Sequence, residues 1–192
     1  DDVESRGLGD VYKRQAEAVY EEKKIEEMEV IFLMDRFGYA RTIDKAAYER
    51  NKETADSENK YIFSCMNTDK ICVFTDSGRM HTIKVLDLPF GKFRDKGTPI
   101  DNVSNYDSSA EQMVFVSGLS GIKDSMLFFA TKTGMLKQVA GTEFDVSKRT
   151  IAATKLADGD KLVLVQIADP MEYVVLQLSL IHISEPTRLD VI

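Results

Sequence analysis

One short pattern occurs three times in this 192-residue sequence. Each copy is an apolar run, a short polar turn, a glycine and a second run in which apolar and polar residues alternate. The glycines are Gly38, Gly78 and Gly134, which are 40 and 56 residues apart. Apolar β-formers on both sides of a tight turn, with a glycine able to adopt a positive φ, are typical of a β-hairpin. We therefore expect hairpins at 30–43, 71–83 and 126–139.

Further strand-like runs lie between the hairpins. Four short strands in each unit of about 40–55 residues are typical of a β-propeller blade. A β-sandwich would also contain short strands but would not repeat one hairpin at this interval. The sequence predicts an all-β partial β-propeller at 29–177, with about three four-stranded blades and the start of a fourth at 172–177. The additional strands are expected at 61–66, 113–118, 150–156 and 162–167.

Three connecting stretches carry signals of their own. Residues 45–59 form a charged loop that could include a helical turn, and residues 88–111 are the longest irregular stretch. Residues 16–28 are acidic and helix-prone but lack a full apolar stripe. We interpret them as a short helix, a linker from a missing upstream core. A solvated linker without helix is the equal alternative.

The two ends of the chain do not look native. Codons for Ser5–Gln15 (SRGLGDVYKRQ) can be chosen so that their reverse complement encodes Leu178–Arg188 (LSLIHISEPTR) residue for residue. One inverted DNA element at both ends indicates a sequencing adapter rather than protein sequence. We therefore expect residues 1–15 and 178–192 to be adapter-derived. His182 then belongs to the adapter, which leaves His81 as the one native histidine.

Composition and motifs exclude several classes of protein. The chain is 43% apolar and 30% charged, and no apolar run approaches the roughly 18–20 residues that span a bilayer. We find no secretory leader, so we expect a cytoplasmic protein with no membrane partner. Cys65 and Cys72 form no C-x-x-C pair and are expected to be small buried hydrophobes. Signatures of serine hydrolases, P-loops, zinc proteases and dinucleotide sites are missing, so we predict no catalytic residue, no metal site and no cofactor.

Basic residues recur at one position of the repeat. The third residue after each glycine is Arg41, His81 or Lys137, which predicts an evenly spaced basic stripe along one surface. Such a rim binds duplex DNA through phosphates without reading sequence, and about four to six contacts give a salt slope of roughly −4 to −5. The alternative is that these charges only protect strand edges. The candidate DNA-binding residues are Arg36, Arg41, Arg79, His81, Lys84, Lys92, Arg94, Lys132 and Lys137.

The net charge argues against a strongly basic surface. It is −7 for the whole chain, and four of the 25 Lys and Arg and six of the 32 Asp and Glu lie in the two flanks. The remainder therefore has a net charge of −5, whereas nucleic-acid-binding domains usually have a basic excess. Only a local basic surface on an acidic body is compatible with DNA binding.

Several longer phrases resemble a known family. KICVFTDSGRMHTIKVLDLP, RDKGTPIDN, LFFATKTGMLKQV and TIAATKLADGDKLVLVQ are similar to the C-terminal domain of the A subunits of bacterial type IIA topoisomerases, gyrase and topoisomerase IV. The resemblance covers residues 30–177. It includes the K-G-x-P-I element from Lys96 to Ile100 and the F-A-T-K-x-G element from Phe129 to Gly134.

The resemblance implies a pinwheel-type β-propeller that wraps duplex DNA around its perimeter. In that family the wrapped DNA is presented to an upstream cleavage core, which carries the catalytic tyrosine. The implied partners are duplex DNA, that core, the A-subunit dimer and an ATPase B subunit, with ATP and Mg on those other parts. The implied location is the cytoplasm, at the nucleoid. A propeller that serves as a scaffold for protein–protein interaction is the alternative.

The sequence departs from the gyrase pattern at one place. Gyrases of this family carry a basic, glycine-rich box in the first blade, Q-R-R-G-G-x-G. The matching stretch after Tyr48 reads ERNKETADSENK and contains no glycine. The resemblance therefore favours relaxation or decatenation, as in topoisomerase IV, over gyrase-type supercoiling.

Overall fold

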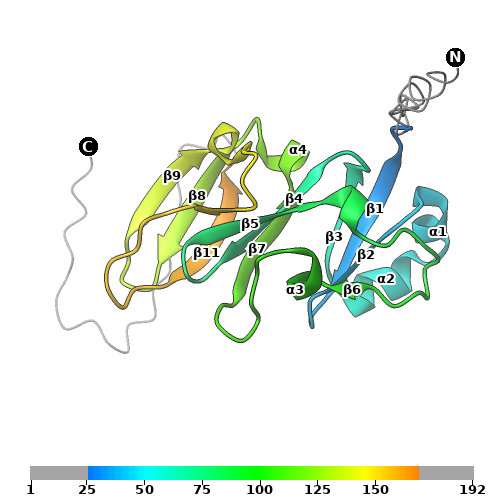
Figure 1. The fold of residues 1–192 in the computed structure, drawn as a ribbon, viewed down its shortest axis with the longest axis horizontal. Helices are drawn as coiled ribbons and strands as arrows, with labels where there is room; N and C mark the ends of the chain where they lie inside the picture. The colour runs from blue at the N-terminus through cyan, green and yellow to red at the C-terminus, as the bar shows by residue number, and fades with distance from the viewer. Residues whose placement is uncertain (1–25, 169–192) are drawn as a thin grey trace, which may run out of the picture.

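The computed structural model describes residues 26–168. The flanking peptides expected at 1–15 and 178–192, the start of a fourth copy at 172–177, and most of the helix expected at 16–28 lie outside these residues. Residues 26–28, which are described, have no regular secondary structure. Within the described part the protein is mostly β, and three antiparallel sheets lie side by side (Figure 1).

The first sheet has the strand order β3-β1-β2-β6. It contains β1 (Glu29–Asp35), β2 (Tyr39–Ile43), β3 (Asn59–Met66) and β6 (Thr98–Pro99). The second sheet has the order β10-β5-β4-β7 and contains β4 (Lys70–Thr75), β5 (Arg79–Lys84), β7 (Met113–Gly118) and β10 (Thr150–Ala152). In the third, β11-β8-β9, the described residues supply β8 (Met126–Thr131), β9 (Leu136–Ala140) and β11 (Leu162–Ala168).

All three predicted hairpins are confirmed as β1–β2, β4–β5 and β8–β9. Gly38, Gly78 and Gly134 have φ of 84°, 76° and 89°, the region that glycine adopts at little cost. The amide of each glycine donates to the carbonyl three residues earlier, at 3.3, 3.0 and 3.0 Å. One turn is therefore built three times from the same local chemistry.

The fourth strand of each complete sheet comes from later in the chain than the sequence units suggest. β6 follows the second hairpin but pairs with β2 in the first sheet, and β10 follows the third hairpin but pairs with β5 in the second. Each sheet thus takes its fourth strand from the connection that follows the next hairpin. The expected strand at 150–156 is shorter than predicted, and β6 lies inside the stretch predicted to be irregular.

Side-chain alternation divides the core into layers. Phe32 and Met34 of β1 point from the first sheet toward the second, where they meet Ile71 and Val73 of β4. The opposite face of β4 packs against the third sheet, and Phe74 contacts both Phe129 and Phe144 edge-on at 5.8 and 5.1 Å between ring centroids. The second sheet therefore uses alternate residues of β4 for its two neighbouring sheets.

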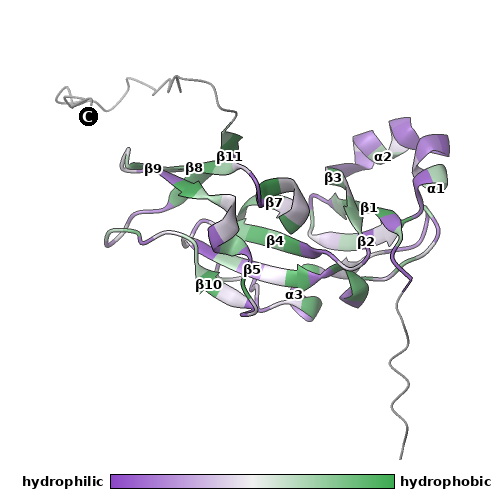
Figure 2. Ribbon diagram, turned by 90° about the horizontal axis from the view of Figure 1, so that it is seen from above, coloured by the Kyte–Doolittle hydropathy of each residue, from purple (hydrophilic) through white to green (hydrophobic). Residues whose placement is uncertain are grey.

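Two helices cover the outer face of the first sheet, where a charged loop that could include a helical turn was predicted. Asp44 caps α1 (Lys45–Arg50) by accepting a hydrogen bond from the Ala47 amide at 2.8 Å, and α2 (Lys52–Glu58) follows directly. Ala47 and Ala55 are buried against the face of β1 that carries Leu33. Most residues of the two helices are hydrophilic (Figure 2). Their apolar face is so narrow that a charged loop was the natural prediction.

Four short helical turns complete the described structure. They are η1 (Val85–Asp87), α3 (Ile100–Val103), α4 (Leu119–Ile122) and η2 (Gly141–Phe144). None of the helices within 26–168 combines the length and the apolar character needed to cross a bilayer.

The strand exchange depends on close backbone approach at Gly97. A Cβ on this residue would lie 2.6 Å from the Ala40 carbonyl oxygen. We expect Gly97→Ala to lower the free energy of unfolding by about 1–3 kcal/mol, since β6 must move away from β2. Gly121→Ala is the control, because its Cβ would meet only the Ser117 hydroxyl at 3.4 Å. Equal denaturation midpoints for both variants would contradict this account of β6.

The two cysteines are free and buried, as predicted. Burial raises the pKa of both the Cys65 and the Cys72 thiol to about 12. Since the thiolate is the reactive form, we expect neither cysteine to react readily with a thiol reagent at pH 8 in the native state, and both to react in denaturant. Rapid labelling of the native protein would show that the layers between the sheets open easily.

Candidate nucleic-acid interface

The nine predicted DNA-binding residues differ in exposure. Arg41 is half-buried and His81 is buried, with 1% of its surface exposed. Arg36 and Lys132 lie in hairpin turns, and Lys92 and Arg94 lie in the connection from the second hairpin to β6. The exposed members are Arg36, Arg79, Lys84, Lys92, Arg94, Lys132 and Lys137.

The basic stripe expected from the third residue after each glycine is wrong at His81. The three residues are structurally equivalent, since Arg41, His81 and Lys137 lie opposite Leu33, Val73 and Phe129. In an antiparallel pair, opposite residues point to the same face of the sheet. Val73 faces the first sheet. The side chain of His81 therefore points between two sheets, whereas that of Lys137 on β9 is exposed.

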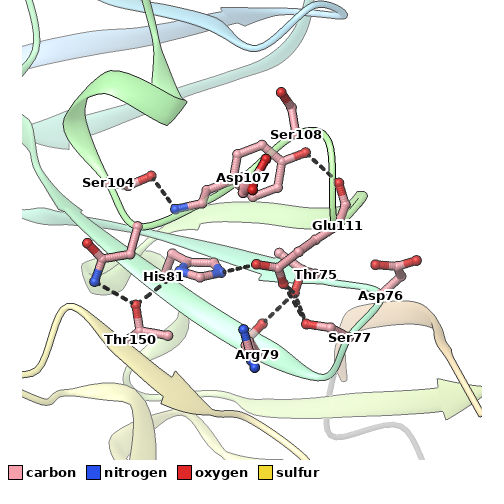
Figure 3. Close-up of polar contacts among 12 residues, drawn as sticks. Thr75, Asp76, Ser77, Arg79, His81, Ser104, Asp107, Ser108, Glu111 and Thr150 are labelled. Atoms are coloured by element: carbon pink, nitrogen blue, oxygen red, sulfur yellow. Dashed lines mark hydrogen bonds and ion pairs between the residues drawn. The ribbon is translucent and has the colours of Figure 1, made fainter.

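His81 is the centre of a buried polar network (Figure 3). Its Nε2 lies 3.0 Å from Glu111 Oε1 and its Nδ1 lies 3.1 Å from the Thr150 hydroxyl. The other Glu111 oxygen accepts hydrogen bonds from the hydroxyls of Thr75 and Ser77. The network ties β5 to β10, the borrowed strand, and to the loop before β7. His81 thus serves the connection between sheets.

Glu111 is ionised in this network. Its burial raises the pKa, but hydrogen bonds from Ser77 and Thr75 and the proximity of His81 outweigh burial, so the pKa lies below the usual 4.5. The Tyr106 hydroxyl donates to the Glu111 backbone carbonyl at 3.1 Å. Only 6% of the surface of Glu111 is exposed, so its carboxylate is unsuited to contact with a macromolecule.

Arg41 has no sheet in front of it and meets Phe93 instead. Its guanidinium carbon lies 5.9 Å from the Phe93 ring centroid, within cation–π range. Its buried Nε has no hydrogen-bond partner among the described residues. Arg41 is therefore partly accessible but held against the connection that leads to β6.

Basic side chains gather on the segments that lead into the borrowed strands. We call residues 89–97, before β6, and residues 145–149, before β10, the lead-in segments. Both are fixed to the hairpin in the same way, since the amides of Thr42 and Thr82 donate to the carbonyls of Pro89 and Arg149 at 2.9 and 2.8 Å. The exposed cations of the two segments are Lys92, Arg94, Lys96, Lys148 and Arg149.

The opposite edge of each sheet carries little charge. The edge strands there are β3, β7 and β11, and of these β7 and β11 contain no charged residue while β3 contains only Lys60. Lys137 of β9 lies on the same side of its sheet as the lead-in segments, because β9 corresponds to β2 and β5. The lead-in segments and Lys137 thus place six exposed cations along one edge of three successive sheets. Sequence spacing alone missed this arrangement because it depends on strand exchange.

The structure brings together no set of residues typical of a metal centre in the part of the chain that it describes. No three His, Cys, Asp or Glu side chains within residues 26–168 are grouped so as to hold a metal ion. The acidic side chains in the turns instead accept backbone hydrogen bonds, as Asp160 does from the amides of Thr133 and Lys161 at 3.0 and 2.8 Å. These contacts, and a hydrogen bond from Thr131 above all, lower the pKa of Asp160 to about 2.

Comparison with known proteins gives one consistent family. Residues 125–169 match the family described as DNA gyrase C-terminal domain, beta-propeller. The chain is 29% identical over 156 residues to the DNA gyrase A protein of Neisseria gonorrhoeae, covering 76% of the chain and 17% of that protein. It is 34% identical over 120 residues to the DNA gyrase A protein of Chlamydia trachomatis serovar D, covering 61% and 14%. The chain therefore spans less than a fifth of the length of either relative.

Two solved structures share the fold. The C-terminal domain of DNA topoisomerase IV superposes with a TM-score of 0.66 and 19% identity, over 77% of this chain and 48% of that one. The E. coli ParC C-terminal domain superposes with a TM-score of 0.56 and 14% identity, over 72% and 56%. The predicted propeller fold and the predicted resemblance are both confirmed.

The buried network predicts acid sensitivity. Because the folded-state pKa of Glu111 lies below that of an unfolded glutamate, its stabilising effect is complete above about pH 5 and is lost as the pH falls through the folded-state pKa. We expect Glu111→Ala to lower the free energy of unfolding at pH 7 by about 3 kcal/mol, since it leaves His81 buried without its partner. The variant should also lose part of the dependence of stability on pH between about 5 and 3. Denaturant unfolding at several pH values measures both effects.

Glu143→Ala is the control for this experiment, because Glu143 is an exposed glutamate in η2. Its unfolding curve should match that of the parent at every pH. A Glu111→Ala variant as stable as the Glu143→Ala variant would show that the network contributes no stability.

Proposed function

We propose, from the premise that this chain is a C-terminal β-propeller domain of the kind found in the A subunits of bacterial type IIA topoisomerases, that it binds and wraps duplex DNA. The contact is non-specific and electrostatic, along the sheet edge that carries the lead-in segments. The observation that carries the proposal is the row of exposed cations that the lead-in segments and Lys137 place along one edge of three successive sheets. The identity of the curated relatives as DNA gyrase A proteins supports it.

The geometry suits phosphate contacts better than base contacts. The cations lie at intervals set by the sheets, on side chains such as Arg94 and Lys148 that reach outward from irregular segments. Long flexible cations placed at intervals neutralise backbone charge and carry no sequence information. The helices within residues 26–168 have at most seven residues, so none is a long helix that could lie in the major groove. His81 is excluded from the proposed contact because it is buried.

In the whole protein this domain would act with parts that lie outside the chain. We propose that it presents DNA to an upstream cleavage core in an A-subunit dimer, with ATP and Mg used on other domains or on the B subunit. These partners, and the location at the nucleoid in the cytoplasm, follow from the family resemblance.

Activity of the topoisomerase IV type fits this chain better than gyrase-type supercoiling. The stretch that would carry the basic, glycine-rich box is folded into α1 and α2, and its residues include Glu49, Glu53, Asp56 and Glu58. Both helices pack on the outer face of the first sheet. This region therefore supplies no extra basic surface for tight wrapping.

Duplex binding should be weak, independent of sequence and sensitive to salt. We expect the full chain to bind labelled 30–40 bp duplexes of different sequence with equal affinity, and log affinity to fall against log salt with a slope of about −4 to −5. Fluorescence anisotropy across a range of salt concentrations measures both. A flat salt response, or no binding at low ionic strength, would refute the proposal.

Charge reversal locates the contact. We expect Lys92→Glu/Arg94→Glu to weaken binding to all duplexes alike, because both side chains lie on a lead-in segment. The control is Lys52→Glu/Lys60→Glu, which changes the net charge equally but on α2 and β3, away from that edge. Equal weakening by both pairs would indicate that only net charge matters. A chain that folds but does not bind DNA would favour the alternative, a scaffold that binds another protein.

A further inference from the structure

A small cavity lies beside the second lead-in segment. It has a volume of about 40 Å³, whereas one water molecule needs about 10–15 Å³ measured in the same way. It is lined by the end of β5, the start of β4, α3 and the lead-in segment before β10. The lining includes Lys70, Thr82, Lys84, Asp87, Lys148 and Arg149.

The charge of the lining is strongly positive. Four of the side chains that line the cavity are cationic, and the lining contains one carboxylate, that of Asp87. Lys70 is already engaged, since its Nζ lies 3.0 Å from the Val146 carbonyl and 3.4 Å from Asp145. Lys84, Lys148 and Arg149 are exposed and take part in no ion pair among the described residues. Three cations outside any ion pair thus line a cavity that has one carboxylate, Asp87, in its lining.

A hydroxyl in the same cavity has no partner. The buried Oγ1 of Thr82 makes no hydrogen bond within the described part of the chain. Leaving a buried hydroxyl unpaired costs about 1–3 kcal/mol, so such a group marks a place where a further acceptor or donor would be favourable. Thr82 faces the same side of its sheet as Lys84 and Lys70, because Lys84 lies opposite Lys70 and two residues along the strand from Thr82.

In the preceding repeat, the threonine at the same position does form a side-chain hydrogen bond. Thr42, like Thr82, is the fourth residue after its turn glycine, and both donate their amide to a lead-in connection. The Thr42 hydroxyl also donates to the Pro89 carbonyl, at 3.2 Å. Within the described residues, the Thr82 hydroxyl makes no corresponding bond to Arg149. The two threonines therefore differ in one respect, and the difference coincides with the basic cavity.

We infer that this cavity is a phosphate-binding site, which holds a backbone phosphate of duplex DNA. A hydroxyl donor, two lysines and an arginine at the mouth of a small cavity fit the size, charge and acceptor oxygens of a phosphate group. This inference rests on the proposed function for the source of the phosphate. The site adds one specific phosphate contact to a DNA interface that otherwise depends on dispersed surface cations.

Matched threonine variants test this phosphate contact in the full chain. We expect Thr82→Val to weaken duplex binding by about 3–10-fold, the loss of roughly one hydrogen bond to a charged group. Thr42→Val should leave the affinity unchanged, because its hydroxyl is already used inside the protein. Thermal melts of both variants show whether they fold. If parent and Thr82→Val bind DNA equally well while Lys92→Glu/Arg94→Glu binds less, the proposed function stands and this site is overturned.

Lys84→Gln/Arg149→Gln tests the charge. We expect it to lower the affinity for all sequences and to make the salt slope shallower by about one to two. An unchanged slope would show that the two side chains do not neutralise phosphate.

A second experiment uses inorganic phosphate and tests whether the cavity binds phosphate independently of DNA. In NMR titrations, millimolar phosphate should shift the Thr82 amide signal of the parent, and sodium chloride of equal ionic strength should not. If the chain fails to bind DNA but phosphate shifts this signal in the parent and not in Thr82→Val, the proposed function fails and the cavity is a site for free phosphate. If phosphate has no effect on Thr82, the site is overturned whatever happens with DNA.

Discussion

Backbone pairing between each hairpin and a strand borrowed from the following repeat is the constraint on which the rest of the structure depends. β6 has two residues and β10 has three, so neither could persist by itself. Each is held where its lead-in segment is already fixed to the hairpin by a threonine amide. The buried pair of His81 and Glu111 then ties β10 to the second sheet from the side. Because neighbouring sheets share chain in this way, their spacing and orientation are set by covalent connection as well as by packing.

This constraint explains where the charges lie. A segment that crosses from one sheet to the edge of another must run over the surface, where backbone groups need water and side chains need solubility. Its residues are therefore free to be basic, as Arg94 and Lys148 are. The strands at the opposite edge, β3, β7 and β11, each pair with one neighbour and together contain a single charged residue, Lys60. A basic edge is thus a consequence of the topology, and DNA binding requires only that those exposed positions be occupied by lysine and arginine.

The sequence predicted the local structure well and the non-local structure poorly. Apolar alternation and a turn glycine are contained within about 14 residues, so all three hairpins could be read directly. A two-residue strand such as β6 has no pattern of its own, and its partner lies about 58 residues earlier, so strand exchange could not be found this way. His81 is a different case, because the information was present. It lies opposite Val73, one of the apolar positions shared by all three hairpins, and this pairing places it on a buried face. Equal spacing from the glycine does not make these positions face solvent, because each sheet has a different neighbour on that face.

The acidic net charge is compatible with DNA binding once the roles of the acids are considered. Asp35, Asp76 and Asp160 accept backbone amides in or beside the hairpin turns, and Asp44 caps α1. Asp145 is occupied by Lys70 and Lys123. The field of each of these carboxylates is partly compensated at short range by the dipoles or charges that it contacts. Arg94, Lys148 and Arg149 have no such compensation from the described residues, and at physiological salt charges more than about 8 Å apart are largely screened from one another. A phosphate that approaches the lead-in segments therefore responds mainly to those cations, and much less to the formal charge of the whole chain.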